Sequence, residues 1–146
     1  TETNPWLADM QPILNSPFLS VHVAIVSVAY LLLLLAFIVS IPGIITGRYL
    51  LLSRLMLYPS VACLAIGIFV GAIWANLSWG EYWSWDPKES WALVSMMVYA
   101  VALHDRSIPW LRSARHYHLF ISLSFLVLLM TCFGVNMLLS GLHSYA

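Results

Sequence analysis

Apolar residues run in four long blocks along this chain, and the charged residues gather between the blocks. No Asp, Glu, Lys or Arg occurs in residues 10–47, 55–80, 90–104 or 116–146. A helix rises ~1.5 Å per residue, so ~20 apolar residues cross the ~30 Å hydrocarbon core of a bilayer. The pattern predicts four transmembrane helices, at about residues 18–41, 55–77, 87–104 and 119–139.

The third helix depends on its N-terminal sequence, because its apolar core from Trp91 to Leu103 is short. Asp86 is a candidate N-cap, Pro87 suits the first helical position, and Glu89 completes a D-x-x-E capping box. A helix from Asp86 to His104 would be ~27 Å long, enough to cross a bilayer when its first turn lies in the interface.

The first and second helices carry signals of their own. Asn15 or Ser16 can cap the first helix, and Ile41-Pro42-Gly43 is expected to weaken or end it. In the second helix, Gly67 and Gly71 form a GxxxG arrangement, which allows close backbone contact with a neighbouring helix.

Composition narrows the class of protein. Hydrophobic residues make up 62% of the chain and charged residues 8%, a ratio that soluble globular domains of this size do not show. Six basic and six acidic side chains leave no cationic surface, which argues against nucleic acid as a partner. Cys63 and Cys132 have no second cysteine nearby, so neither a CxxC redox pair nor a zinc site is expected. We expect one membrane domain over residues 1–146, an all-α polytopic helix bundle in the lipid bilayer.

The basic residues predict an orientation. Five of the six lie in or beside the first and third connections: Arg48, Arg54, Arg106, Arg112 and Arg115. By the positive-inside rule this side is cytoplasmic or its equivalent, so both termini and the connection between the second and third helices face outward. Residues 1–17 lack the basic region and short apolar core of a signal peptide. Either the first span directs insertion, or the chain is part of a longer protein.

The outward connection, residues 79–91, is rich in tryptophan. It holds four of the seven tryptophans, Trp79, Trp83, Trp85 and Trp91, together with four charged residues and the Asp-Pro helix start. One interpretation is an interfacial aromatic belt. The other is a shaped platform for a large, flat apolar ligand with polar edges.

Two histidines lie on the same predicted face as this Trp-rich loop. His22 occupies the first turns of the first helix, and His143 follows the fourth helix. Each alone is compatible with an ordinary interfacial polar residue. Two imidazoles beside several indoles also provide what a porphyrin requires, namely two axial nitrogens for iron and flat rings to stack on the macrocycle.

The run WGEYWSWDPKESWAL resembles the WWD signature of the haem-handling proteins of cytochrome c biogenesis. Its DPKE continuation is similar to the CcsA (ResC) type of System II synthetases. The segments NSPFLSVHV, LHDR and FGVNMLLSGLHSYA are similar as well, so the resemblance covers nearly the whole chain from about Asn15.

The resemblance implies that His22 and His143 are external axial ligands of haem b. It implies that the WWD loop holds the haem and presents its vinyl groups to the CxxCH segment of an apocytochrome c. The loop residues around the porphyrin would be Trp79, Trp83, Trp85, Asp86 and Trp91. For Asp86, a mainly structural N-cap role and an added haem contact both stay open. His104 would receive haem near the inner ends of the helices.

The family also implies partners and a place. A complete CcsA-like protein has additional spans before these, so the chain corresponds to its C-terminal half. It works with a CcsB-like (ResB) subunit as a holocytochrome c synthetase of the haem lyase type. A bacterial cytoplasmic membrane is expected in preference to a plastid thylakoid membrane. His116 and His118 lie outside the motif and are expected to be solvated residues of a basic loop.

Two other functions remain open from the sequence. A bis-histidine b-type electron-transfer subunit would also bind haem, although such proteins usually bury both ligands between facing helices. A transporter or lipid-binding module usually has polar groups near the membrane middle. The predicted spans hold little there beyond Ser27, Ser95, Ser122, Ser124 and Thr131.

Overall fold

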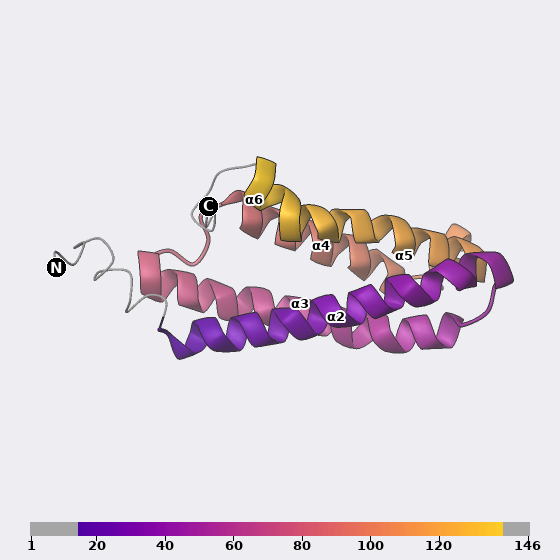
Figure 1. Ribbon diagram of the computed structural model, residues 1–146, viewed down its shortest axis with the longest axis horizontal. Helices are drawn as coiled ribbons and strands as arrows, with labels where there is room; N and C mark the ends of the chain where they lie inside the picture. Colours follow the sequence, from indigo (N-terminus) through magenta and orange to yellow (C-terminus); the bar gives the residue numbers. More distant parts are fainter. Residues whose placement is uncertain (1–14, 139–146) are drawn as a thin grey trace, which may run out of the picture.

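The structure, a computed structural model, describes residues 15–138, which are helical apart from short connections (Figure 1). The helical elements are α2 (Pro17–Thr46), α3 (Leu50–Trp79), α4 (Pro87–Leu103), the 3₁₀ turn η1 (Pro109–Arg112), α5 (Ala114–Leu129), the π-helical turn η2 (Met130–Gly134) and α6 (Val135–Leu138).

Successive helices run antiparallel in an elongated bundle. Helix α2 packs along α3 and also against α5, while α4 lies beside α3 and α5 (Figure 1). The start of α2, the α3–α4 loop and α6 therefore lie at one end of the bundle. The α2–α3 turn and the α4–α5 connection lie at the other end.

Within residues 15–138, three stretches are long and apolar enough to cross a membrane: Pro17–Thr46, Leu50–Trp79 and the combined Ala114–Leu138. Helix α4 has 17 residues. Its bounds agree closely with the predicted 87–104, and Asp86 caps it as the sequence indicated. The predicted helical bundle is confirmed, whereas a complete crossing by α4 stays a prediction.

The sequence predicted that Ile41-Pro42-Gly43 would weaken or end the first helix. Helix α2 does not end there but continues to Thr46. Proline removes a single N–H donor, and ending the helix there would leave several backbone groups to be satisfied elsewhere. The helix ends instead at Gly47, whose φ of 70° is left-handed and whose N–H donates to the Gly43 carbonyl oxygen at 2.8 Å.

Helices α3 and α5 begin at Leu50 and Ala114, earlier than the predicted 55 and 119. Charge-free blocks mark the hydrocarbon boundary, whereas a helix continues through charged residues that reach water or a counter-ion. Arg54 forms an ion pair with the buried Asp105, and its guanidinium carbon lies 5.7 Å from the ring centroid of Tyr117. This ion pair ties the start of α3 to the α4–α5 connection.

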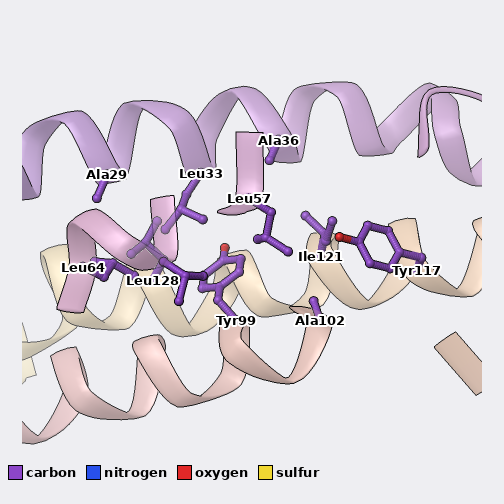
Figure 2. Packing of buried hydrophobic residues seen from close by; sticks show 11 residues of the cluster. Ala29, Leu33, Ala36, Leu57, Leu64, Tyr99, Ala102, Tyr117, Ile121 and Leu128 are labelled. Carbon is purple, nitrogen blue, oxygen red and sulfur yellow. The ribbon is translucent and has the colours of Figure 1, made fainter. Parts of the chain in front are cut away.

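The apolar core runs along the bundle axis and draws on all four long helices. Figure 2 shows its buried residues Ala29, Leu33 and Ala36 of α2, Leu57 and Leu64 of α3, Tyr99 and Ala102 of α4, and Tyr117, Ile121 and Leu128 of α5. The small side chains of Ala29 and Ala36 let the neighbouring helices approach α2 closely. Close approach increases the van der Waals contact between helices, on which their association in a membrane depends.

His118 is fully buried, so the expectation that it is solvated was wrong. It lies on α5 because that helix begins before the predicted start. Its Nδ1 is 3.3 Å from the hydroxyls of Ser40 and Ser53, and its Nε2 is 2.8 Å from the Arg48 carbonyl oxygen. A methyl group at Gly43 would lie 2.5 Å from the imidazole ring. The ring thus joins α2, α3 and α5 at the basic end.

His116, in contrast, is exposed, as expected from the sequence. Its ring stacks on Trp110 with centroids 4.7 Å apart and an interplanar angle of 9°. The two histidines are two positions apart on one helix and therefore face different directions.

We expect His118→Ala to destabilise the bundle, because it leaves a cavity and deprives buried oxygens of a partner. An unsatisfied buried polar group costs about 1–3 kcal/mol, which should lower the melting temperature measured by circular dichroism in detergent. The matched control His116→Ala should leave the melting temperature nearly unchanged. Equal effects of the two substitutions would contradict the assignment of His118 as a joint between helices.

Candidate functional site

A cavity of about 310 Å³ lies at the end of the bundle that carries the Trp-rich loop. This volume is at the lower end of the range for small-molecule sites, which is ~300–1,000 Å³. Its walls come from the N-terminal half of α2, the C-terminal half of α3, the α3–α4 loop, the first turns of α4 and the π-helical turn η2. The polar and aromatic side chains that line it are His22, Ser27, Tyr30, Trp74, Tyr82, Trp83, Lys88, Glu89 and Thr131.

His22 is half-buried in the first two turns of α2 and crosses over to α3. Its Nδ1 lies 2.7 Å from the Gly67 carbonyl oxygen. A carbonyl oxygen only accepts, so Nδ1 carries the proton and donates it. In the neutral ring, Nε2 then holds the lone pair. A carbonyl that fixes the ring in this way is typical of histidines that bind a metal.

The Trp-rich loop begins where α3 ends at Gly80. That glycine has a left-handed φ of 80°, and its N–H donates to the Asn76 carbonyl oxygen at 2.8 Å. At the other end of the loop, the predicted capping box is confirmed. The Asp86 carboxylate accepts from Lys88 N at 3.0 Å, and the Glu89 carboxylate accepts from Asp86 N at 3.2 Å.

Glu89 also holds the middle of the loop. Its Oε2 accepts from the backbone N–H of Ser84 at 2.9 Å and from the Ser84 hydroxyl at 3.3 Å. Together with the bond from Asp86, one carboxylate oxygen gathers three donors that flank Trp85. The charge of Glu89 is thus used to shape the loop, although the side chain also lines the cavity.

Trp83 and Trp85 point in different directions from this shaped loop. Their rings meet edge to face, with centroids 5.7 Å apart and an interplanar angle of 86°. Trp83 lines the cavity, and its indole N–H is buried with no hydrogen-bond partner in the described part of the chain. Trp85 is 72% exposed and has a left-handed φ of 58°. Trp83 therefore offers a ring and a donor to the cavity, whereas Trp85 faces outward.

Three other predicted residues of the loop do not line the cavity. Trp79 meets Trp74 edge to face at 4.9 Å, and Trp74 is the one of the two that lines the cavity. Asp86 is buried as the helix cap. The Trp91 carbonyl oxygen accepts from the Thr131 hydroxyl at 3.0 Å. Each of the three thus contacts a residue that lines the cavity, namely Trp74, Lys88 or Thr131.

Of the remaining two predicted residues, the structure describes only His104. His104 is exposed at the C-terminus of α4, at the basic end of the bundle, and its Nδ1 lies 3.0 Å from the Ala100 carbonyl oxygen. His143 lies outside the described residues. Among the predicted ligands that the structure describes, only His22 and Trp83 line the cavity.

Several lining residues were not predicted as part of the site. Tyr30 lies two helical turns after His22 on the same face of α2, so helical periodicity could have identified it. Thr131 belongs to the π-helical turn, where its hydroxyl lies 2.7 Å from Ser95 Oγ. A π-turn is not evident from a uniformly apolar sequence, and such turns are frequent at functional sites.

Comparison with known proteins identifies relatives over most of the chain. A family described as "Cytochrome C assembly protein" matches residues 2–143. The protein NrfI of Wolinella succinogenes is 35% identical over 98% of this chain and 18% of its own length. The cytochrome c biogenesis proteins CcsA of Nicotiana tomentosiformis and Panax ginseng are each 50% identical over 56% of this chain. The matches cover 26% and 25% of those two proteins. The chain therefore spans about a quarter of the length of the CcsA proteins and 18% of the length of NrfI.

We expect Glu89→Ala to loosen the Trp-rich loop, because hydrogen bonds to a charged group contribute about 1.5–3 kcal/mol. Amide hydrogen exchange at Ser84 and Asp86 should become about tenfold faster or more. Glu81→Ala removes an exposed carboxylate of the same loop and serves as the matched control. Unchanged exchange in the Glu89 variant would show that the loop keeps its shape without this carboxylate.

Proposed function

The chain belongs to the family of cytochrome c assembly proteins and is of the CcsA type, and we propose that it binds haem b and presents it to an apocytochrome c. The observation that carries this proposal is the position of His22. An imidazole whose Nδ1 proton is engaged by a carbonyl lines the same cavity as Trp83 of the Trp-rich loop.

The residues of the cavity fit a metalloporphyrin in three respects. His22 Nε2 carries a lone pair for iron, aromatic rings provide flat walls, and the buried Trp83 N–H offers a donor to a polar edge. The small volume favours one edge of the macrocycle inside the cavity and the other edge outside. On this proposal His143 supplies the second axial nitrogen, as the family resemblance implies.

The proposed chemistry is thioether formation with a CxxCH segment. Each cysteine S–H adds across one vinyl group of the haem, so a C–S bond and a C–H bond form and no electrons are exchanged with a third reactant. We assign no catalytic acid or base to this chain. Its contribution would be to hold the haem and its vinyl groups in one orientation, which accelerates the reaction by proximity.

The other loop residues have supporting roles in this proposal. Trp79, Asp86 and Trp91 would keep the aromatic wall in place, and the exposed Trp85 would contact the haem edge or the incoming apocytochrome. His104, at the opposite end, would receive haem from the inner side. The complete synthetase would include a CcsB-like (ResB) subunit.

The distribution of charge supports an outward-facing loop. The arginines lie in or beside the α2–α3 turn and the α4–α5 connection: Arg48, Arg54, Arg106, Arg112 and Arg115. Both connections are at the end of the bundle opposite the Trp-rich loop (Figure 1). By the positive-inside rule, we propose that this end faces the cytoplasm of a bacterium and the loop faces outward. The corresponding arrangement in a plastid thylakoid membrane is the alternative.

Cysteine labelling tests this orientation. In a background that lacks Cys63 and Cys132, we expect Ser84→Cys to react with an impermeant maleimide from outside intact cells. Ser113→Cys, at a position that is also exposed but lies at the opposite end, should react only after permeabilisation. The reverse pattern would contradict the proposed orientation.

Substitution of the two histidines tests the haem proposal. His22→Gly or His143→Gly should lower the haem that copurifies with the chain, or shift its absorption spectrum, because iron loses an axial nitrogen. External imidazole should restore the spectrum by entering the space that the side chain left. His116→Gly is the control and should change neither quantity. If haem content, spectrum and cytochrome maturation all stay normal in the double variant of the assembled synthetase, the assignment of His22 and His143 as axial ligands is wrong.

A further inference from the structure

We propose that Gly67 and Gly71 of α3 form a seat for the imidazole of His22, and that Gly71 is a positioning residue for its iron-binding nitrogen. This inference rests on the proposed function, because it concerns how His22 is held for a metal. It gives the second glycine of the GxxxG motif a task beyond helix packing.

Gly71 lies directly against the imidazole ring. A Cβ at this position would be 2.7 Å from both Cε1 and Nδ1 of His22. Real Cβ atoms essentially never approach other heavy atoms this closely. The ring therefore occupies the volume of the missing side chain, and both residues line the same cavity.

Gly67 contributes in another way. Its carbonyl oxygen accepts the Nδ1 proton of His22 at 2.7 Å. A Cβ at Gly67 would not meet the histidine but would lie 2.7 Å from Cγ2 of Val26, one turn further along α2. The missing side chain at Gly67 lets the two helices approach, and this approach brings the carbonyl within reach of the ring.

The two contacts together fix the tautomer and the direction of the ring. The carbonyl determines which nitrogen carries the proton, and the bare surface at Gly71 determines where the ring lies. A methyl group at residue 71 would push the ring away and lengthen the bond to the Gly67 carbonyl oxygen. Loss of such an outer partner of a metal ligand typically costs 10–100-fold in affinity.

The decisive experiment compares Gly71→Ala with Gly67→Ala. Both variants place a methyl group 2.7 Å from a side chain of α2, but the side chain is His22 in the first case and Val26 in the second. Haem affinity and the absorption spectrum are measured on the purified chain in detergent. Nitrogen NMR of the haem-free chain reports the tautomer of His22.

We expect Gly71→Ala to lower haem affinity 10–100-fold and to give a mixture of His22 tautomers. Gly67→Ala combined with Val26→Ala, which removes the clashing methyl groups, should keep both the affinity and the Nδ1–H tautomer. In a His22→Gly background without added imidazole, Gly71→Ala should cause no further loss, because no ring remains for the methyl group to displace. A general packing defect would instead lower affinity by the same factor in both backgrounds.

The outcomes separate this inference from the proposed function. An unchanged tautomer in Gly71→Ala would overturn the seat, whatever the haem affinity, and so would an equal loss of affinity in the two backgrounds. A changed tautomer with normal haem binding in both Gly71→Ala and His22→Gly would overturn the axial-ligand role of His22. The positioning role of Gly71 would then fail with it, whereas the haem binding of the proposed function would stand.

Discussion

The close approach of α2 to α3 is the constraint on which the rest of the structure depends. Lipid tails are as apolar as leucine, so helices in a membrane associate through tight packing and through polar contacts between them. Here glycine in one helix repeatedly faces a large side chain from another. Gly67 receives Val26 and Gly71 receives His22, while Gly43 at the basic end receives His118. Each imidazole then reaches a backbone carbonyl, that of Gly67 or of Arg48. The same geometry therefore gives close packing and satisfies polar groups that the bilayer cannot solvate.

The two ends of the bundle use these histidines for different purposes. His118 is enclosed, and each ring nitrogen lies near an oxygen of a neighbouring helix or turn, so it stabilises the junction of three helices. His22 borders a cavity and presents its ring beside aromatic side chains. Burial, rather than residue type, distinguishes the structural histidine from the candidate ligand.

Much of this fold could be predicted from charge spacing and capping chemistry. The capping box at Asp86 and Glu89 correctly located the start of α4, because both partners of the box are local in sequence. The start of α3 was missed because Arg54 finds its counter-ion, Asp105, far away in the chain. The start of α5 was missed because that helix continues through Arg115, which is exposed. For the candidate site, the loop motif and His22 could be identified from the sequence. Which tryptophan lines the cavity and which is exposed depends on the path of the loop backbone, which the sequence does not show. The wall residue Thr131 depends on a π-turn that shifts the phase of the last helix, so a regular helical pattern would misplace it.

Trp85 adopts a left-handed backbone conformation, which is unfavourable for a bulky side chain. A left-handed conformation costs a bulky residue about 1–2 kcal/mol, and glycine or asparagine would avoid most of this cost. The indole at this position is 72% exposed, so burial within the bundle does not offset the cost. Folding stability alone would thus select against tryptophan here. The conformation instead turns a rigid aromatic surface outward from a loop that Glu89 holds in place.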